Sequence, residues 1–201
     1  MISNNVMYRV FQIRVGSWTG TAFTVDIDMR QYWITAKHLL EEWTSGGYVD
    51  VRRGDIWCPI DMDLVGMHAT ADVAVLRAAI HIPAYPVSAD HGGLFFGQDV
   101  FFLGYPHGKG FKVDDSLNRG FPAPFVKKGC VSAFAADDVD GRDILILDGH
   151  NNPGFSGGPV VFRRMSDPVN VLSFAGIVSN YGEVDGPVYF RSDSGEEEPT
   201  S

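Results

Sequence analysis

The sequence predicts an all-β fold built from two β-barrel halves. Short runs rich in β-branched and aromatic residues recur about every ten residues, separated by Gly, Pro, Asp or Asn, a pattern typical of sandwiches and barrels. The 201-residue chain contains 23 glycines, which suits many tight turns. An irregular segment at 79–93 divides the runs into two groups of similar size, so we expect one barrel on each side of this connector.

The first group of strands is expected to form barrel one, at about 1–82, and the second to form barrel two, at about 94–191. The apolar runs between turn residues in the first group are 6–15, 21–27, 31–35, 48–52, 56–65 and 73–77. In the second group they are 98–103, 129–134, 143–147, 159–163, 171–179 and 187–190. Helical periodicity is scarce, and only 37–43 is predicted to be a short helix.

The charge distribution argues against a protein that binds nucleic acid. The formal net charge is −9, whereas a nucleic-acid-binding protein would present a basic face. Basic and aromatic residues are mixed in 109–128, and the acidic balance of the chain makes a solvated loop the better interpretation. Residues 192–201 hold four acidic side chains and no basic one, so we expect an acidic disordered tail there.

The composition also predicts the compartment and the cofactor requirement. No apolar run approaches the ~18 residues of a membrane span. Arg9 and Arg14 interrupt what would be the apolar segment of a signal peptide, and Cys58 and Cys130 cannot form a disulfide framework. We therefore expect a cytoplasmic protein. The six histidines are scattered without ligand spacing, so we expect no metal and no cofactor.

The strongest local signal is a serine between glycines, at Ser156 in the sequence Asn-Pro-Gly-Phe-Ser-Gly-Gly-Pro. Glycines allow backbone conformations closed to other residues and let a substrate approach closely. A nucleophilic serine needs that exposure, together with backbone N–H groups that stabilise an oxyanion. The competing interpretation is an ordinary Gly-Ser turn before an apolar strand.

A serine nucleophile needs a base and an orienting carboxylate. His38 stands where a predicted strand ends and the short helix begins, and Asp72 directly precedes an apolar strand. Each residue alone is better explained as structural. Together they occur in the order His, Asp, Ser, 34 and 84 residues apart, which is the chain order of one of the known serine triads.

At these motifs the chain resembles chymotrypsin-fold serine proteases, and most closely the bacterial HtrA-type branch. The matching segments, over roughly 16–190, are GTAFTV from Gly20, ITAKHLL from Ile34, ADVAVLRA from Ala71, GYPHG from Gly104, KGCVSA from Lys128 and DGHNNPGFSGGPVV from Asp148. The resemblance implies two six-stranded antiparallel β-barrels with the active site in the cleft between them. It also implies a protein or peptide substrate.

The resemblance assigns a role to each matching residue. Ser156 would be the nucleophile, His38 the general base and acid, and Asp72 the orienting carboxylate. The N–H groups of Gly154 and Ser156 would form the oxyanion hole, with that of Phe155 contributing in some conformations. The residues implied in substrate binding are His150, near the specificity pocket, Ser179, which would hydrogen-bond Asp72, and Asn180 and Tyr181, which would border the substrate.

Several positions depart from the family pattern. Lys37 precedes His38 where a small residue is usual, and we expect its side chain to be exposed. Phe155 stands before the serine, where the family usually has an aspartate or asparagine. In the trypsin branch that aspartate pairs with the new N-terminus made by zymogen cleavage, so the resemblance implies no such activation here. Few residues follow the last motif, so we expect no C-terminal PDZ domain. The stretch 105–127 is either an activation-type loop that orders the oxyanion hole or a plain surface insertion.

These observations favour a serine endopeptidase that works through a triad and an acyl-enzyme. A rival interpretation is a catalytically silent binding module that keeps the protease fold and holds a peptide or protein partner. Another is an effector that is latent until a protein partner activates it. A viral polyprotein-processing protease would be a variant of the same chemistry.

Overall fold

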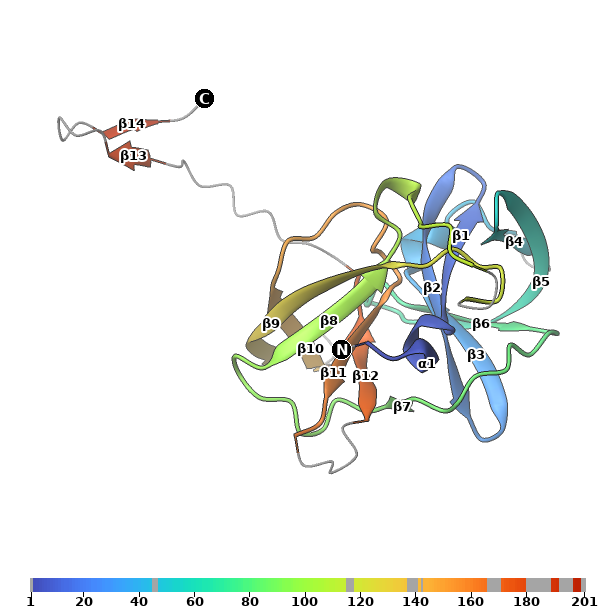
Figure 1. The fold of residues 1–201 in the computed structure, drawn as a ribbon, viewed down its shortest axis with the longest axis horizontal. Helices are drawn as coiled ribbons and strands as arrows, with labels where there is room; N and C mark the ends of the chain where they lie inside the picture. The colour runs from blue at the N-terminus through green and yellow to red at the C-terminus, as the bar shows by residue number, and fades with distance from the viewer. Residues whose placement is uncertain are drawn as a thin grey trace.

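The all-β class and the chymotrypsin-type arrangement are confirmed. The computed structural model describes residues 2–44, 47–114, 118–136, 141, 143–165 and 171–179, and the backbone of 189–191 and 197–199. Two curled β-sheets stand side by side, the N-terminal half of the chain forming one and most of the C-terminal half the other (Figure 1).

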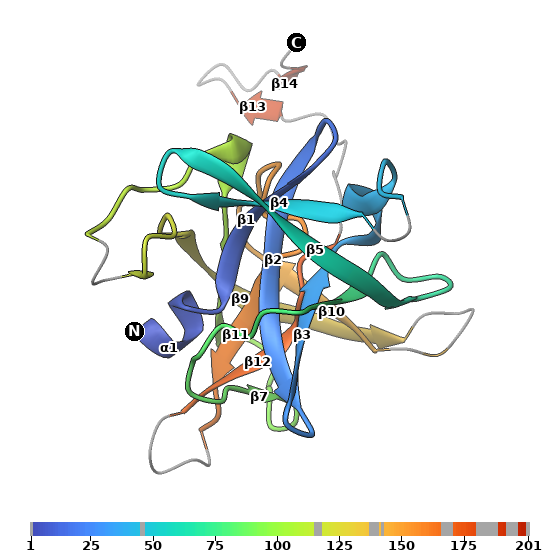
Figure 2. The same cartoon turned by 90° about the vertical axis from the view of Figure 1, so that its right-hand side faces the viewer.

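The first sheet is a closed antiparallel barrel in the order β1-β2-β3-β6-β5-β4 (Figure 2). Its strands are β1 (Val10–Val15), β2 (Trp18–Ile27), β3 (Arg30–Thr35), β4 (Tyr48–Arg53), β5 (Ile56–Met67) and β6 (Ala74–Ala78). Tight turns join β1 to β2, β2 to β3 and β4 to β5, and the β2–β3 turn places both Asp28 and Met29 at positive φ, as a type I′ hairpin turn requires. All six strands predicted for barrel one are therefore present.

The second sheet has six strands in the order β10-β9-β8-β11-β12-β7. They are β7 (Ser88–Ala89), β8 (Asp99–Gly104), β9 (Phe125–Ala136), β10 (Asp143–Asp148), β11 (Pro159–Arg163) and β12 (Leu172–Ile177). In the described residues this sheet is curled but open. Its sixth strand differs from the expectation, because β7 comes from the predicted connector and runs parallel to β12. The part of the predicted strand 187–190 that the structure describes does not belong to this sheet.

The helical elements that lie wholly within the described residues are short turns. They are α1 (Asn4–Met7), η1 (Lys37–Leu40) and η2 (Pro106–Gly108). The predicted strand 6–15 begins only at Val10, because Val6 is buried on the helical turn instead. The predicted helix 37–43 is a 3₁₀ turn of four residues. No helix in the described part of the chain is long and apolar enough to span a membrane.

The C-terminal residues contribute one small sheet. Strands β13 (Tyr189–Arg191) and β14 (Glu197–Pro199) pair antiparallel. β14 falls within the predicted acidic tail, and the rest of 192–201 lies outside the described residues.

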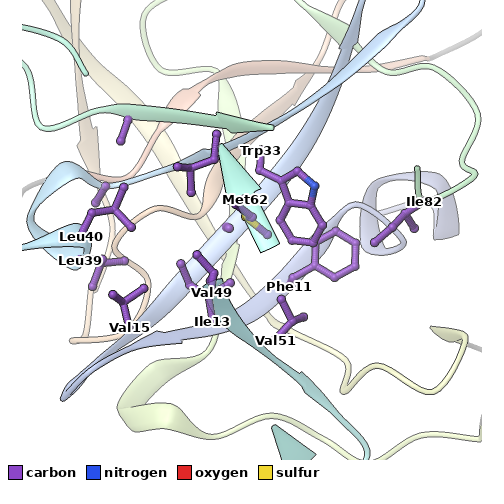
Figure 3. Packing of buried hydrophobic residues seen from close by; sticks show 14 residues of the cluster. Phe11, Ile13, Val15, Trp33, Leu39, Leu40, Val49, Val51, Met62 and Ile82 are labelled. Atoms are coloured by element: carbon purple, nitrogen blue, oxygen red, sulfur yellow. The ribbon is translucent and has the colours of Figure 1, made fainter. Parts of the chain in front are cut away.

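Buried apolar side chains fill the barrel and join it to the second sheet. Inside the barrel, Phe11 and Trp33 stack with ring centroids 4.6 Å apart, and Met62 lies beside them (Figure 3). A second cluster includes residues of both halves, with Phe23 of β2 and Phe174 of β12 in ring contact at 5.0 Å. The two halves thus share a core, which fixes the position of residues that each contributes to the region between them.

Candidate active site

His38 and Asp72 are joined by two hydrogen bonds. His38 lies in η1, directly after β3, and Asp72 lies just before β6, the neighbour of β3 in the barrel. The carboxylate Oδ2 is 2.6 Å from the imidazole Nδ1, and Oδ1 accepts the backbone N–H of His38 at 2.8 Å. Because the carboxylate holds both the ring and the backbone that carries it, Nδ1 keeps its proton and Nε2 is left to accept one.

The surroundings of His38 leave its ring accessible. The imidazole side chain is 32% exposed, and the edge of Trp18 contacts it at 6.0 Å between ring centroids. Lys37 is half-buried rather than fully exposed, because its ammonium donates to the carbonyls of His68 at 3.2 Å and Ala69 at 3.4 Å. These contacts tie Lys37 to the loop that leads to Asp72.

The turn that carries Ser156 is docked on the first barrel close to His38. The Ser156 carbonyl accepts the backbone N–H of Thr21 at 2.9 Å. Gly157 has φ +82°, and a Cβ there would lie 2.0 Å from the Thr21 carbonyl oxygen and 3.0 Å from the backbone nitrogen of Ala36. The glycine therefore lets the serine turn press against β2 and the start of η1. The structure thus brings Ser156 to the same end of the barrel as His38.

Every carbonyl from residue 153 to residue 156 accepts a hydrogen bond. The donors are the N–H of His107 to Pro153 (2.8 Å), Thr21 Oγ1 to Gly154 (2.7 Å), the N–H of Gly158 to Phe155 (2.8 Å) and the N–H of Thr21 to Ser156 (2.9 Å). Because the C=O and N–H of a planar trans peptide point to opposite sides, each anchored carbonyl also sets the direction of the next amide. The orientation of the whole segment is therefore fixed.

Two amides of this segment are left for a ligand. Within the described residues, the N–H of Phe155 donates to Asn152 (3.3 Å) and that of Gly157 to Val178 (2.8 Å), whereas those of Gly154 and Ser156 have no acceptor. Gly154 has φ +101° and follows proline, the conformation of a type II turn. Two free backbone donors, one on the serine itself and one two residues before it, are the kind of groups that stabilise an oxyanion. In this conformation Phe155 contributes no free amide.

Phe155 anchors the segment by hydrophobic packing. Its side chain is fully buried and meets the ring of Phe102 edge-on, with centroids 5.2 Å apart. Gly104 makes room for it, since a Cβ there would lie 2.8 Å from the Phe155 ring. An apolar anchor thus stands where an acidic residue is usual in the resembling family.

The residues implied in substrate binding are only partly described. His150 is exposed, with Nε2 3.2 Å from the Asn152 side-chain nitrogen. Ser179 follows β12 and is one residue from Val178, which pairs with the serine turn, but among the described residues it forms no hydrogen bond with Asp72. Asn180 and Tyr181 lie outside the described residues.

The turn after β8 supports the serine segment, a role that the sequence motifs alone do not indicate. The backbone N–H of His107 holds Pro153, and that of Tyr105 lies 3.3 Å from the Gly154 carbonyl. The Tyr105 ring is buried, and its hydroxyl reaches the carbonyls of Val10 (3.0 Å) and Pro122 (2.9 Å). Burial raises the pKa of Tyr105 far above its ordinary value, so the hydroxyl remains a donor. The GYPHG motif marked this segment in the sequence but did not indicate these partners.

Metal-binding residues do not gather in the part of the chain that the structure describes. It contains no group of three or more His, Cys, Asp or Glu side chains that could hold an ion. Cys58 and Cys130 are both free thiols.

Comparison with known proteins shows the family of this chain. A family model described as a trypsin-like peptidase domain matches residues 20–165. No curated protein sequence matches the chain.

Solved protease structures share the fold at low sequence identity. An inactive form of Rv3671c from M. tuberculosis H37Rv, carrying a serine-to-alanine mutation, is 22% identical, with a TM-score of 0.56 over 84% of this chain and 80% of that one. The apo protease domain of MamO from Magnetospirillum magneticum is 19% identical, with a TM-score of 0.55 over 97% and 91%. The HtrA-type protease AlgW, bound to a tripeptide, is 20% identical, with a TM-score of 0.57 over 80% of this chain and 50% of that one. Since the family model covers well over half of the sequence, the chain belongs to the trypsin-like peptidase domain family.

Proposed function

We propose that this protein is a serine endopeptidase in which Ser156 is the nucleophile, His38 the general base and Asp72 the orienting carboxylate. The observation that carries the proposal is the pair of backbone amides, of Gly154 and of Ser156 itself, that have no acceptor among the described residues. An ordinary Gly-Ser turn has no reason to leave the donors of residues 154 and 156 free while every carbonyl from residue 153 to residue 156 is paired. His38, which two hydrogen bonds join to Asp72 at the same end of the barrel, supplies the base.

Acylation follows from these positions. Ser156 Oγ attacks the scissile carbonyl while its proton passes to Nε2 of His38. Asp72 holds Nδ1–H and stabilises the imidazolium that forms. The amides of Gly154 and Ser156 donate to the oxygen as it becomes negative. Collapse of the tetrahedral intermediate transfers the proton from His38 to the leaving amine and leaves an acyl-Ser156 ester.

Deacylation repeats the sequence with water. His38 removes a proton from a water molecule that attacks the ester carbonyl, and the same two amides stabilise the second oxyanion. Protonated His38 then returns the proton to Ser156 Oγ as the peptide acid leaves. Every proton is accounted for by protein and water, so the proposed cycle uses no cofactor.

Labelling with a fluorophosphonate probe tests the proposal without knowledge of the preferred peptide. The probe needs an activated serine and a working oxyanion site. We expect wild type to be labelled, and Ser156→Ala to be labelled at least ~10³-fold more slowly. Ser132→Ala, at an exposed serine on β9, is the matched control and should behave as wild type.

Equal labelling of wild type and Ser156→Ala would show that Ser156 is not the nucleophile. A folded wild type that stays unlabelled would favour the silent binding module or the latent effector. Those two are separated by whether a bound peptide or protein partner makes Ser156 reactive.

A further inference from the structure

Lys127 on β9 holds the stretch of chain that leads to Ser156. Its ammonium donates to the carbonyl of His150 at 2.8 Å and to Oδ1 of Asn152. The same nitrogen is 5.1 Å from the centre of the Phe155 ring, within the range of a cation–π contact. One side chain therefore contacts three positions in the six residues before the serine.

The neighbouring lysine shows that this placement is specific. Successive residues of a strand point to opposite faces of the sheet. Lys128 accordingly points away from the serine segment and pairs with Asp99 at 2.8 Å, with both side chains more than half exposed. The contacts of Lys127 thus arise from its position on β9 and not from a generally basic stretch.

The contacts of Lys127 act on the turn at 152–155, which carries the free Gly154 amide and leads to Ser156. The carbonyl of Asn152 accepts the N–H of Phe155 and so closes the turn through Pro153 and Gly154. Fixing the Asn152 side chain and the His150 carbonyl fixes the start of that turn. The Phe155 ring, which the ammonium also contacts, fixes its end. A segment held at both ends keeps its peptide planes in one orientation.

We propose that Lys127 is a positioning residue that holds the turn at 152–155 in the orientation that leaves the Gly154 and Ser156 amides without an acceptor among the described residues. This rests on the proposed serine mechanism and adds how its oxyanion site is maintained. Among the described residues the partners of the ammonium are a carbonyl, a side-chain amide and a ring, with no carboxylate.

The environment of Lys127 supports this role. Burial lowers the pKa of its ammonium below the ordinary value, so the group is placed there at some cost in hydration. Hydrogen bonds from a charged donor are stronger than neutral ones, and here they offset that cost. Because both bonds end on 150–152, the stabilisation they give acts on the segment before the serine.

Saturation kinetics of fluorophosphonate labelling test the proposal. For Lys127→Met we expect the maximal labelling rate to fall at least ~10-fold, because removing one oxyanion donor outright costs ~10²–10³ and a displaced turn costs part of that. The probe concentration at half-maximal rate should stay within about threefold, since probe binding is not the step affected. Lys127→Arg should recover part of the rate, and Lys128→Met should match wild type.

Hydrogen exchange of the peptide that covers 150–156 gives a second measurement that does not need activity. We expect faster exchange there in Lys127→Met than in Lys128→Met, with unchanged exchange in the β4–β5 hairpin showing that the variant is folded. Equal labelling kinetics and equal exchange in the two variants would overturn the proposal. If wild type is not labelled at all, the serine mechanism fails, and the exchange comparison alone decides whether Lys127 holds the turn.

Discussion

Thr21 offers a sharp test of how the first barrel holds the serine segment. Its side chain is fully buried on β2, and its hydroxyl donates to the Gly154 carbonyl at 2.7 Å and lies 3.3 Å from the Tyr105 amide. Thr21→Val keeps the shape and removes both contacts. The Tyr105 amide keeps a 3.3 Å contact with the Gly154 carbonyl, so the main loss is one short buried hydrogen bond.

The same strand supplies a matched control. Thr24 is equally buried, but in the described part of the chain its hydroxyl has no hydrogen-bond partner. Losing the Thr21 bond and leaving its partners underpaired costs about 2 kcal/mol. Thr24→Val removes a hydroxyl that was desolvated without compensation, so its free energy of unfolding should stay equal or rise.

Denaturant and thermal unfolding of the two variants measure this difference. We expect the free energy of unfolding of Thr21→Val to lie about 2 kcal/mol below that of Thr24→Val, which corresponds to about 4–8 °C in Tm for a chain of this size. Thr21→Val should also be labelled more slowly by a fluorophosphonate, because the Gly154 carbonyl is less firmly held. If the two variants unfold at the same denaturant concentration, the Thr21 hydroxyl does not secure the segment.

Three further tests have expected outcomes. Asp72→Asn should slow fluorophosphonate labelling by ~10³–10⁴, because the amide no longer selects the imidazole tautomer that accepts the serine proton. A labelling rate close to wild type would show that Asp72 is not the orienting carboxylate. Gly157→Ala should lower the free energy of unfolding by more than ~2 kcal/mol, since it combines φ +82° with a 2.0 Å backbone clash, whereas Gly66→Ala, with nothing within 4 Å, should change it by under ~0.5 kcal/mol in urea titrations. Arg9→Met should lower the free energy of unfolding by ~3–5 kcal/mol, because it removes a fully buried guanidinium from its ion pair with Asp26. Arg14→Met, where the arginine side chain is 39% exposed, should lower it by at most ~1 kcal/mol; equal Tm shifts would contradict this.

Much of the fold was predictable because turn residues punctuate the chain at nearly every strand end. Two differences have local causes. Val6 is apolar and therefore falls within the predicted strand 6–15, but it is buried on a helical turn that precedes β1. Ser88 and Ala89 pair with β12 through backbone hydrogen bonds. Almost any sequence can form such bonds, so no side-chain pattern predicts them.

The site was predictable to the extent that chemistry restricts residue type. A triad needs histidine, a carboxylate and serine, so His38, Asp72 and Ser156 could be proposed from motif and order. The groups that hold the serine segment were not predictable in this way. Thr21 acts through a hydroxyl that many residues could replace in a strand pattern, and His107 acts through its backbone N–H. Such contacts depend on three-dimensional proximity between segments more than 40 residues apart.

Peptide mapping of the labelled protein tests the central claim most directly. After reaction with a fluorophosphonate and digestion, mass spectrometry locates the adduct on a single residue. The triad and the paired backbone around it predict one adduct per chain, on Ser156, and its loss in Ser156→Ala. An adduct on another residue, such as the exposed Ser132, or no adduct on folded wild type, would contradict the account.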